Sequence, residues 1–123
     1  MVALARRCGR RSTLGCMLRV VFSRVRDGQV ERLRAWMREL MARPDEVRAT
    51  FDQEGVRHEV AYLVEAREGP LLVYAIELEN EDRAQQAFEH STLPIDLEHR
   101  RTMNEVLEAR GQASVELLYE LQR

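Results

Sequence analysis

The spacing of apolar residues changes period several times between residues 18 and 121, and this order constrains the fold more than any other feature of the chain. Short β-branched or alternating runs predict strands at residues 18–25, 56–65, 70–79 and 113–121. A helical stripe lies between the first two of these strands and consists of Val30, Leu33, Met37, Leu40 and Met41. A second helix, with Ala84, Ala87 and Phe88, is expected between the last two.

Proline, glycine and asparagine predict where these helices begin, break and end. Pro44 precedes two acidic residues and fits the first turn of a new helical piece, and Gly55 supplies the left-handed residue that commonly ends a helix. Asn80 is a favourable N-cap for the second helix. This helix is expected to break at residues 91–93 and to restart at Pro94, running to about Arg110.

The resulting order of elements, βαββαβ, is typical of a ferredoxin-like α+β domain. We expect a four-stranded antiparallel sheet with the helices on one face. The first and last strands are expected to pair at its middle.

Strand alternation divides the side chains between the two faces of this sheet. We expect the bulkier set under the helices, namely Leu18, Val20, Phe22, His58, Val60, Tyr62, Val64, Leu72, Tyr74, Ile76, Leu78, Val115, Leu117, Tyr119 and Leu121. The opposite face keeps many apolar residues, whereas a solvated face would alternate to polar ones. Because no segment is left to cover it, we expect a homodimer packed through this open sheet face.

Charge is distributed unevenly along the chain. Its formal net charge is -2, yet residues 1–16 carry no acid and four bases, Arg6, Arg7, Arg10 and Arg11, which leaves -6 for the rest. We expect this basic leader to be a disordered tail or the product of an upstream start site, and residues 17–123 to form one domain. An acidic body argues against nucleic-acid binding.

The composition also bears on the location and source of the protein. No apolar run approaches the roughly 20 residues of a membrane helix, and the leader lacks the apolar core of a secretory signal. We therefore expect no membrane partner and a cytoplasmic location. All 19 basic residues are arginine, which indicates a GC-rich bacterial source.

Several kinds of chemistry have no support in the sequence. Both cysteines, Cys8 and Cys16, lie in the leader, so the core has no thiol for a disulfide, a metal or a nucleophile. The chain contains no nucleotide-binding glycine loop, no CxxC, no HExxH and no GxSxG motif. We expect no cofactor and no bound metal.

The imidazole and phenol groups of the chain are nevertheless predicted to lie together on the helix side of the sheet. His99 follows Ile95 by one helical turn and so points inward, toward the face on which His58 and the tyrosines are placed. A neutral imidazole accepts a proton near pH 7 and a phenol can donate or orient. The candidate catalytic residues are His99, Tyr62, Tyr74 and His58, and the candidate ligand-binding residues are Tyr119, Asp96 and Glu59.

Each candidate also has a structural explanation. His99 and a tyrosine can satisfy each other within a core, and Asp96 lies in a first helical turn, where the free N–H groups favour a carboxylate. Asp96 and His99, with His90, Glu59 or His58, can also be considered as a divalent-metal site. Glu54 and Glu59 are candidate general bases or solvated surface carboxylates.

The segment 54–108 resembles a family of small bacterial proteins classed as a domain of unknown function. The resemblance rests on EGVRHE before a strand and on STLPIDLEH at the helix break, and it covers residues 17–121. It implies a dimeric α+β barrel and carries no assigned activity. Other dimeric α+β barrels bind ligands between sheet and helices, which is an analogy at the level of fold.

Together these observations predict a dimeric protein that binds a small organic ligand between sheet and helices, with cofactor-free acid/base chemistry as an open question. The alternative is a non-catalytic structural or regulatory homodimer. A void lined by the hydroxyl and imidazole groups would favour the ligand, and direct mutual hydrogen bonds without a void would favour the alternative.

Overall fold

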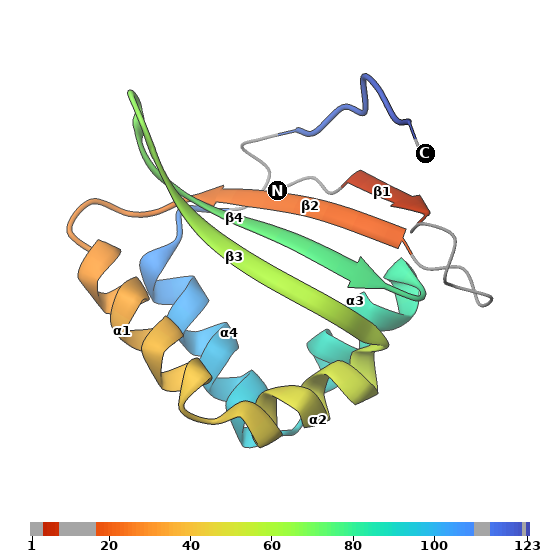
Figure 1. The fold of residues 1–123 in the computed structure, drawn as a ribbon. Coiled ribbons are helices and arrows are strands. Elements are labelled where there is room, and N and C mark those ends of the chain that lie inside the picture. The colour runs from red at the N-terminus through yellow and green to blue at the C-terminus, as the bar shows by residue number, and fades with distance from the viewer. Residues whose placement is uncertain (1–3, 8–16, 110–113, 122) are drawn as a thin grey trace.

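The helices of the chain pack against one face of an antiparallel sheet (Figure 1). The computed structural model describes residues 4–7, 17–109, 114–121 and 123. In sheet order the strands are β1 (Leu4–Arg7), β2 (Met17–Arg24), β4 (Gly69–Leu78) and β3 (Val56–Ala66). The helices in these residues are α1 (Val30–Met41), α2 (Pro44–Glu54), α3 (Glu81–His90) and α4 (Pro94–Val106). The fold is therefore α+β, as the sequence predicts.

Strands β2, β4 and β3 match three of the four predicted strands, with β2 and β4 at the centre of the sheet and β3 at one edge. The prediction that the first and last strands pair at the middle is wrong, because β2 pairs with β4 there. The predicted last strand is also wrong for its described part, since residues 114–121 form no strand and lie on the side of the sheet opposite the helices (Figure 1).

The free edge of β2 is occupied instead by β1, which comes from the basic leader and pairs from Leu4 opposite Val20 to Arg7 opposite Met17. The remainder of the leader, residues 1–3 and 8–16, lies outside the described residues, and both cysteines lie there.

The helix boundaries follow the local signals in the sequence. Pro44 and Pro94 lie in the first turns of α2 and α4, and Gly55 ends α2 with a φ of 72°. The side chain of Asn80 caps α3 by accepting a hydrogen bond from the backbone N–H of Arg83 at 2.8 Å.

Helix α4 ends at Val106, earlier than predicted. The chain turns back there to pair with the end of β2: the N–H of Arg26 donates to the carbonyl of Val106, and that of Glu108 donates to the carbonyl of Arg24. These bonds replace the helical bonds that the sequence pattern would have continued.

The predicted division of side chains between the sheet faces holds for β4 and is wrong for β2 and β3. Val21 and Ala61 both lie opposite Tyr74, so they share its face, and this face is the one toward the helices. The residues predicted to face the helices from β2 and β3 therefore face away; they are Leu18, Val20, Phe22, His58, Val60, Tyr62 and Val64.

The size of the side chains did not predict which face of the sheet meets the helices, because both faces are apolar. The inward positions of β2 and β3 carry polar or small residues, among them Arg19, Glu59 and Ala61, since they border a cleft and not a filled core. Packing is dense at one end of β4, where Val25, Leu33, Leu72 and Val106 are buried together. None of the helices in the described residues has the length and apolar character required to cross a membrane.

Candidate functional site

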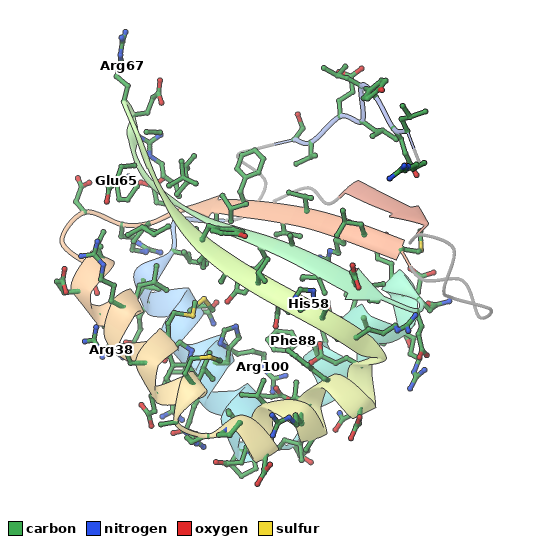
Figure 2. All side chains as sticks on the ribbon, in the orientation of Figure 1. Arg38, His58, Glu65, Arg67, Phe88 and Arg100 are labelled. Atoms are coloured by element: carbon green, nitrogen blue, oxygen red, sulfur yellow. The ribbon has the colours of Figure 1, made fainter. Side chains whose placement is uncertain are left out.

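A cleft of about 910 Å³ lies between the inward face of the sheet and the helices. This volume falls within the range of small-molecule sites, roughly 300 to 1,000 Å³. Its walls are mostly apolar and include Val21, Met37, Leu40, Phe51, Ile76 and Phe88. In Figure 2, Phe88 and Arg100 lie on the helix side of the sheet, beneath β3 and β4. Polar residues reach the cleft from both walls, among them Arg19, Glu59 and Tyr74 from the sheet and Glu54, Asp96, His99 and Arg100 from the helices.

His99 projects from α4 into the cleft and is held by Trp36 of α1. The indole Nε1–H of Trp36 donates to Nδ1 of His99 at 2.8 Å, and Trp36 is buried. Because an indole can only donate, Nδ1 must be the unprotonated nitrogen, and the neutral ring carries its proton on Nε2. Burial lowers the pKa of His99 to about 4, although the nearby Asp96 opposes this shift. At physiological pH His99 is therefore a neutral hydrogen-bond donor and a poor general base.

The hydroxyl of Tyr74, on β4, is buried and has no hydrogen-bond partner among the described residues. The ring of Tyr74 meets that of His99 edge to face, with 6.5 Å between the ring centroids. Burial, and to a lesser degree the charge of Glu59, raise the pKa of the Tyr74 phenol well above its usual value. An unsatisfied buried hydroxyl costs about 1–3 kcal/mol, which makes this group a candidate contact for a molecule bound in the cleft.

Glu59 on β3 and Arg19 on β2 flank Ile76 of β4, since both residues lie opposite it in the sheet. Burial raises the pKa of the Glu59 carboxyl to about 7, and the charge of Arg19 restrains the rise. Arg19 forms an ion pair with Glu81 at 3.7 Å, while its Nε is buried without a hydrogen-bond partner among the described residues. Glu59 is thus a carboxyl that can gain or lose a proton near neutral pH.

Glu54 reaches the same cleft from the end of α2. Burial raises its pKa to about 8, with further contributions from the charges of Asp96 and Glu59 and an opposing one from Arg19. The two glutamates that the sequence presents as either bases or solvated carboxylates are therefore both partly withdrawn from solvent.

Asp96 stabilises the break between α3 and α4. Its carboxylate accepts hydrogen bonds from the hydroxyls of Thr50, at 2.9 Å, and Ser91, and all three residues are buried. The hydroxyl of Ser91 also accepts from the N–H of Leu93. These bonds tie α2 to the start of α4 and thereby fix the direction in which His99 points, so Asp96 acts on the cleft mainly through its neighbours.

The structure brings together four of the seven candidate residues, namely His99, Tyr74, Glu59 and Asp96. His58 and Tyr62 face away from the helices, and Tyr62 is 59% exposed although it borders one edge of the cleft. Tyr119 is 76% exposed in the C-terminal segment and does not line the cleft.

The metal hypothesis gains no support from this arrangement. His90 is exposed, and its Nδ1 lies 3.0 Å from the carbonyl of Gln86, within its own helix. Within residues 4–7, 17–109, 114–121 and 123, no three His, Cys, Asp or Glu side chains are grouped to hold a metal ion.

Sequence reasoning missed two functional features, the hydrogen bond from Trp36 to His99 and the inward position of Arg19. A charged residue within the otherwise apolar run of β2 was a signal for the second. No local sequence signal predicts the hydrogen bond from Trp36 to His99, because it joins residues 63 positions apart.

Comparison with known proteins gives one positive result. A family model described as "Family of unknown function (DUF6176)" matches residues 17–123. The comparisons with curated proteins and with solved structures gave no match.

Proposed function

This chain belongs to DUF6176, a family of unknown function, and we propose that it binds a small, largely apolar organic molecule in the cleft between sheet and helices. The observation that carries the proposal is the buried hydroxyl of Tyr74, which has no partner among the described residues and borders a cleft of about 910 Å³. Neither His99 nor any other described residue pairs with this hydroxyl, although the two rings are neighbours; Nδ1 of His99 accepts its hydrogen bond from Trp36.

The charge around the cleft favours an uncharged ligand. Burial keeps His99 neutral at physiological pH and holds Glu54 and Glu59 largely or partly protonated. Other charged groups of the cleft already have partners: Asp96 accepts hydrogen bonds from two hydroxyls, Arg19 pairs with Glu81, and Arg100 donates to the carbonyls of Phe88 and Ser91.

The proposal includes acid/base chemistry without a cofactor, with Glu59 as the group that exchanges the proton. A general base works best when its pKa lies near the operating pH, and Glu59 meets this condition whereas His99 does not. The sequence-based hypothesis that His99 accepts a proton near pH 7 is thereby replaced by one in which His99 donates a hydrogen bond.

A fluorescent probe tests the cleft directly. Trp36 is the single tryptophan of the chain and donates a hydrogen bond to His99, which lines the cleft, so energy transfer from Trp36 reports binding of the uncharged dye N-phenyl-1-naphthylamine nearby. We expect saturable binding of one probe per chain. Ala61→Phe, which narrows the cleft from β3, should weaken binding at least about tenfold, equivalent to 1.4 kcal/mol.

The matched control is Ala49→Phe, because Ala49 is exposed on α2 and does not line the cleft. This variant should bind the probe like the parent protein. Absence of binding, or equal binding by the Ala61→Phe variant, would contradict the proposed function.

We further propose that the protein is a homodimer, as the sequence suggests, packed through the face of the sheet that points away from the helices. This outer face carries Leu18, Val20, Phe22, Val60, Tyr62, Val64, Leu71 and Val73. Tyr62 is 59% and Val64 is 40% exposed in the single chain, which is costly for apolar groups that alternate along adjacent strands.

The described C-terminal segment supports the same assembly. Residues 114–121 keep the alternation of a strand without forming one, and Leu118, Tyr119 and Leu121 are 75% or more exposed. We propose that this segment becomes ordered against the second copy and completes the ferredoxin-like, dimeric α+β barrel.

Light scattering at micromolar concentration tests the dimer. The parent protein should give twice the monomer mass, and Phe22→Glu should give the monomer mass with unchanged helix content. Thr92→Glu, at an exposed position between α3 and α4, is the control and should stay dimeric. A monomeric parent protein would contradict the dimer.

A further inference from the structure

We propose that the ligand presents a carbonyl oxygen to the Tyr74 hydroxyl and to Nε2–H of His99, and that Glu59 removes a proton from the carbon next to that carbonyl. This inference rests on the proposed function and specifies its ligand class and reaction.

The two donors, the Tyr74 hydroxyl and Nε2–H of His99, form no hydrogen bond with the described residues. The hydroxyl of Tyr74 is buried without a partner among the described residues. Nε2 of His99 takes part in none of the hydrogen bonds of those residues, yet it is not among their buried unpaired atoms, so it is open to the cleft that His99 lines. Both rings are neighbours, one on the sheet and the other on α4.

The protonation state of His99 is fixed before any ligand arrives. The bond from Trp36 occupies Nδ1 and places the proton on Nε2, and burial keeps the ring neutral at physiological pH. A neutral donor suits a carbonyl oxygen that becomes negative during reaction, because it strengthens its hydrogen bond as the charge develops and needs no reorganisation.

Glu59 is placed to act on the neighbouring carbon. Ala61 lies directly opposite Tyr74 in the sheet, and Glu59 is two residues away on the same face, which makes Glu59 a diagonal neighbour of Tyr74. The charge of Glu59 contributes to the raised pKa of the Tyr74 phenol, as expected for two groups on the same face of adjacent strands. Arg19 lies across Ile76 from Glu59 and favours the ionised form that a base requires.

The step balances without a further reactant. The C–H bond next to the carbonyl breaks, its proton passes to the Glu59 carboxylate, and its electron pair moves into an enolate whose oxygen accepts from Tyr74 and His99. Glu59 then returns the proton to the same carbon, which gives exchange with solvent. Where a double bond is conjugated, it returns the proton to the far end of the enolate, which gives isomerisation.

Hydrogen exchange into 2-tetralone tests this inference. The probe is an apolar ketone with acidic hydrogens next to its carbonyl, and its loss of proton signal in D₂O is followed by NMR. The protein should accelerate exchange well above buffer, with a rate that increases with pH around an apparent pKa of about 7, where Glu59 becomes ionised. Glu59→Gln should abolish the acceleration while the ketone still binds.

A variant that lacks one hydrogen-bond donor but still binds the probe shows whether that donor stabilises the enolate or only maintains the fold. Tyr74→Phe should reduce exchange by about 10²–10³-fold, as expected for loss of one oxyanion donor, and should bind N-phenyl-1-naphthylamine, which has no carbonyl, with unchanged affinity. Glu65→Gln is the control, because Glu65 is exposed on the same strand and does not line the cleft, and it should exchange at the parent rate.

The outcomes distinguish this inference from the proposed function. Binding of 2-tetralone without faster exchange, or exchange that survives Glu59→Gln, would overturn the assigned reaction while leaving a ligand-binding cleft. Tighter binding of 2-aminotetralin or of 2-naphthoate than of the ketone would overturn the carbonyl class in favour of a cation or an anion. Failure of the fluorescent probe to bind, or equal binding of the probe by the Ala61→Phe variant, would count against the cleft itself.

Discussion

Replacement of Tyr74 by phenylalanine should make the protein more stable, which is unusual for a change at a buried position. The variant keeps the ring and its edge-to-face contact with His99 and removes only the hydroxyl. This hydroxyl is buried without a partner among the described residues, and such a group costs about 1–3 kcal/mol. We therefore expect the free energy of unfolding to rise by about 1–2 kcal/mol.

The assay is thermal and urea denaturation of the parent protein and the variant without added ligand. For a chain of this length the expected gain corresponds to an increase in Tm of about 4–8 °C. Thr92→Val is the control, since it removes a hydroxyl from an exposed residue outside both the cleft and the proposed dimer face, and it should change stability by less than about 0.5 kcal/mol.

The reasoning would be refuted if Tyr74→Phe lowered the stability by 1 kcal/mol or more, because the hydroxyl would then have a partner that the described residues do not reveal. The predicted gain has a functional meaning. The chain retains a destabilising hydroxyl at this position, as expected when a group is kept for a ligand and not for the fold.

Three further predictions concern the groups around the cleft. Burial raises the pKa of Glu59 from 4.5 to about 7, so ionisation of Glu59 costs the folded state more than the unfolded state. The folded state therefore loses stability as the pH rises from about 4.5 through 7. Glu59→Gln should be more stable than the parent protein at pH 8 but not at pH 4. Trp36→Phe removes the hydrogen bond that favours neutral His99, so the pKa of His99, followed by ¹⁵N NMR, should rise from about 4 toward its ordinary value. Thr50→Val removes one hydrogen bond from the buried carboxylate of Asp96 and should lower the free energy of unfolding by about 1–3 kcal/mol, as measured by urea denaturation.

Each of these predictions has a control or a contradicting result. Glu65→Gln, at an exposed position, should leave the pH dependence of stability unchanged, and Thr92→Val should be neutral. Equal pH profiles for Glu59→Gln and the parent would show that Glu59 is solvated in the folded chain. A pKa of His99 near 6.5 in the parent protein would show that the ring is not buried as described.

The sequence predicted the local structure well, because its signals act over a few residues. Pro44, Gly55, Asn80 and Pro94 occupy the helix ends that their backbone preferences dictate. The predicted strand at 113–121 failed for the opposite reason: its alternation is a local signal, whereas pairing depends on which distant segment occupies the edge of β2.

The site was predicted in part, and the errors have one physical cause. Alternation shows that two sets of side chains face opposite ways but does not show which set meets the helices when both are apolar. Tyr74 and His99 were placed correctly, the first by its strand and the second by its helical spacing from Ile95. His58 and Tyr62 were predicted to face the helices and Glu59 and Arg19 to face away, and the register shows the reverse for all four.

The central claim is that Tyr74, His99 and Glu59 are arranged around an open cleft to receive a ligand. Its most direct test is a titration of ¹⁵N-labelled protein with 2-tetralone, observed at the indole N–H of Trp36 and the imidazole nitrogens of His99. The account predicts saturable shifts of both signals, largest at Nε2 of His99. It is contradicted if both signals stay unchanged while the ketone binds elsewhere, or if the ketone does not bind.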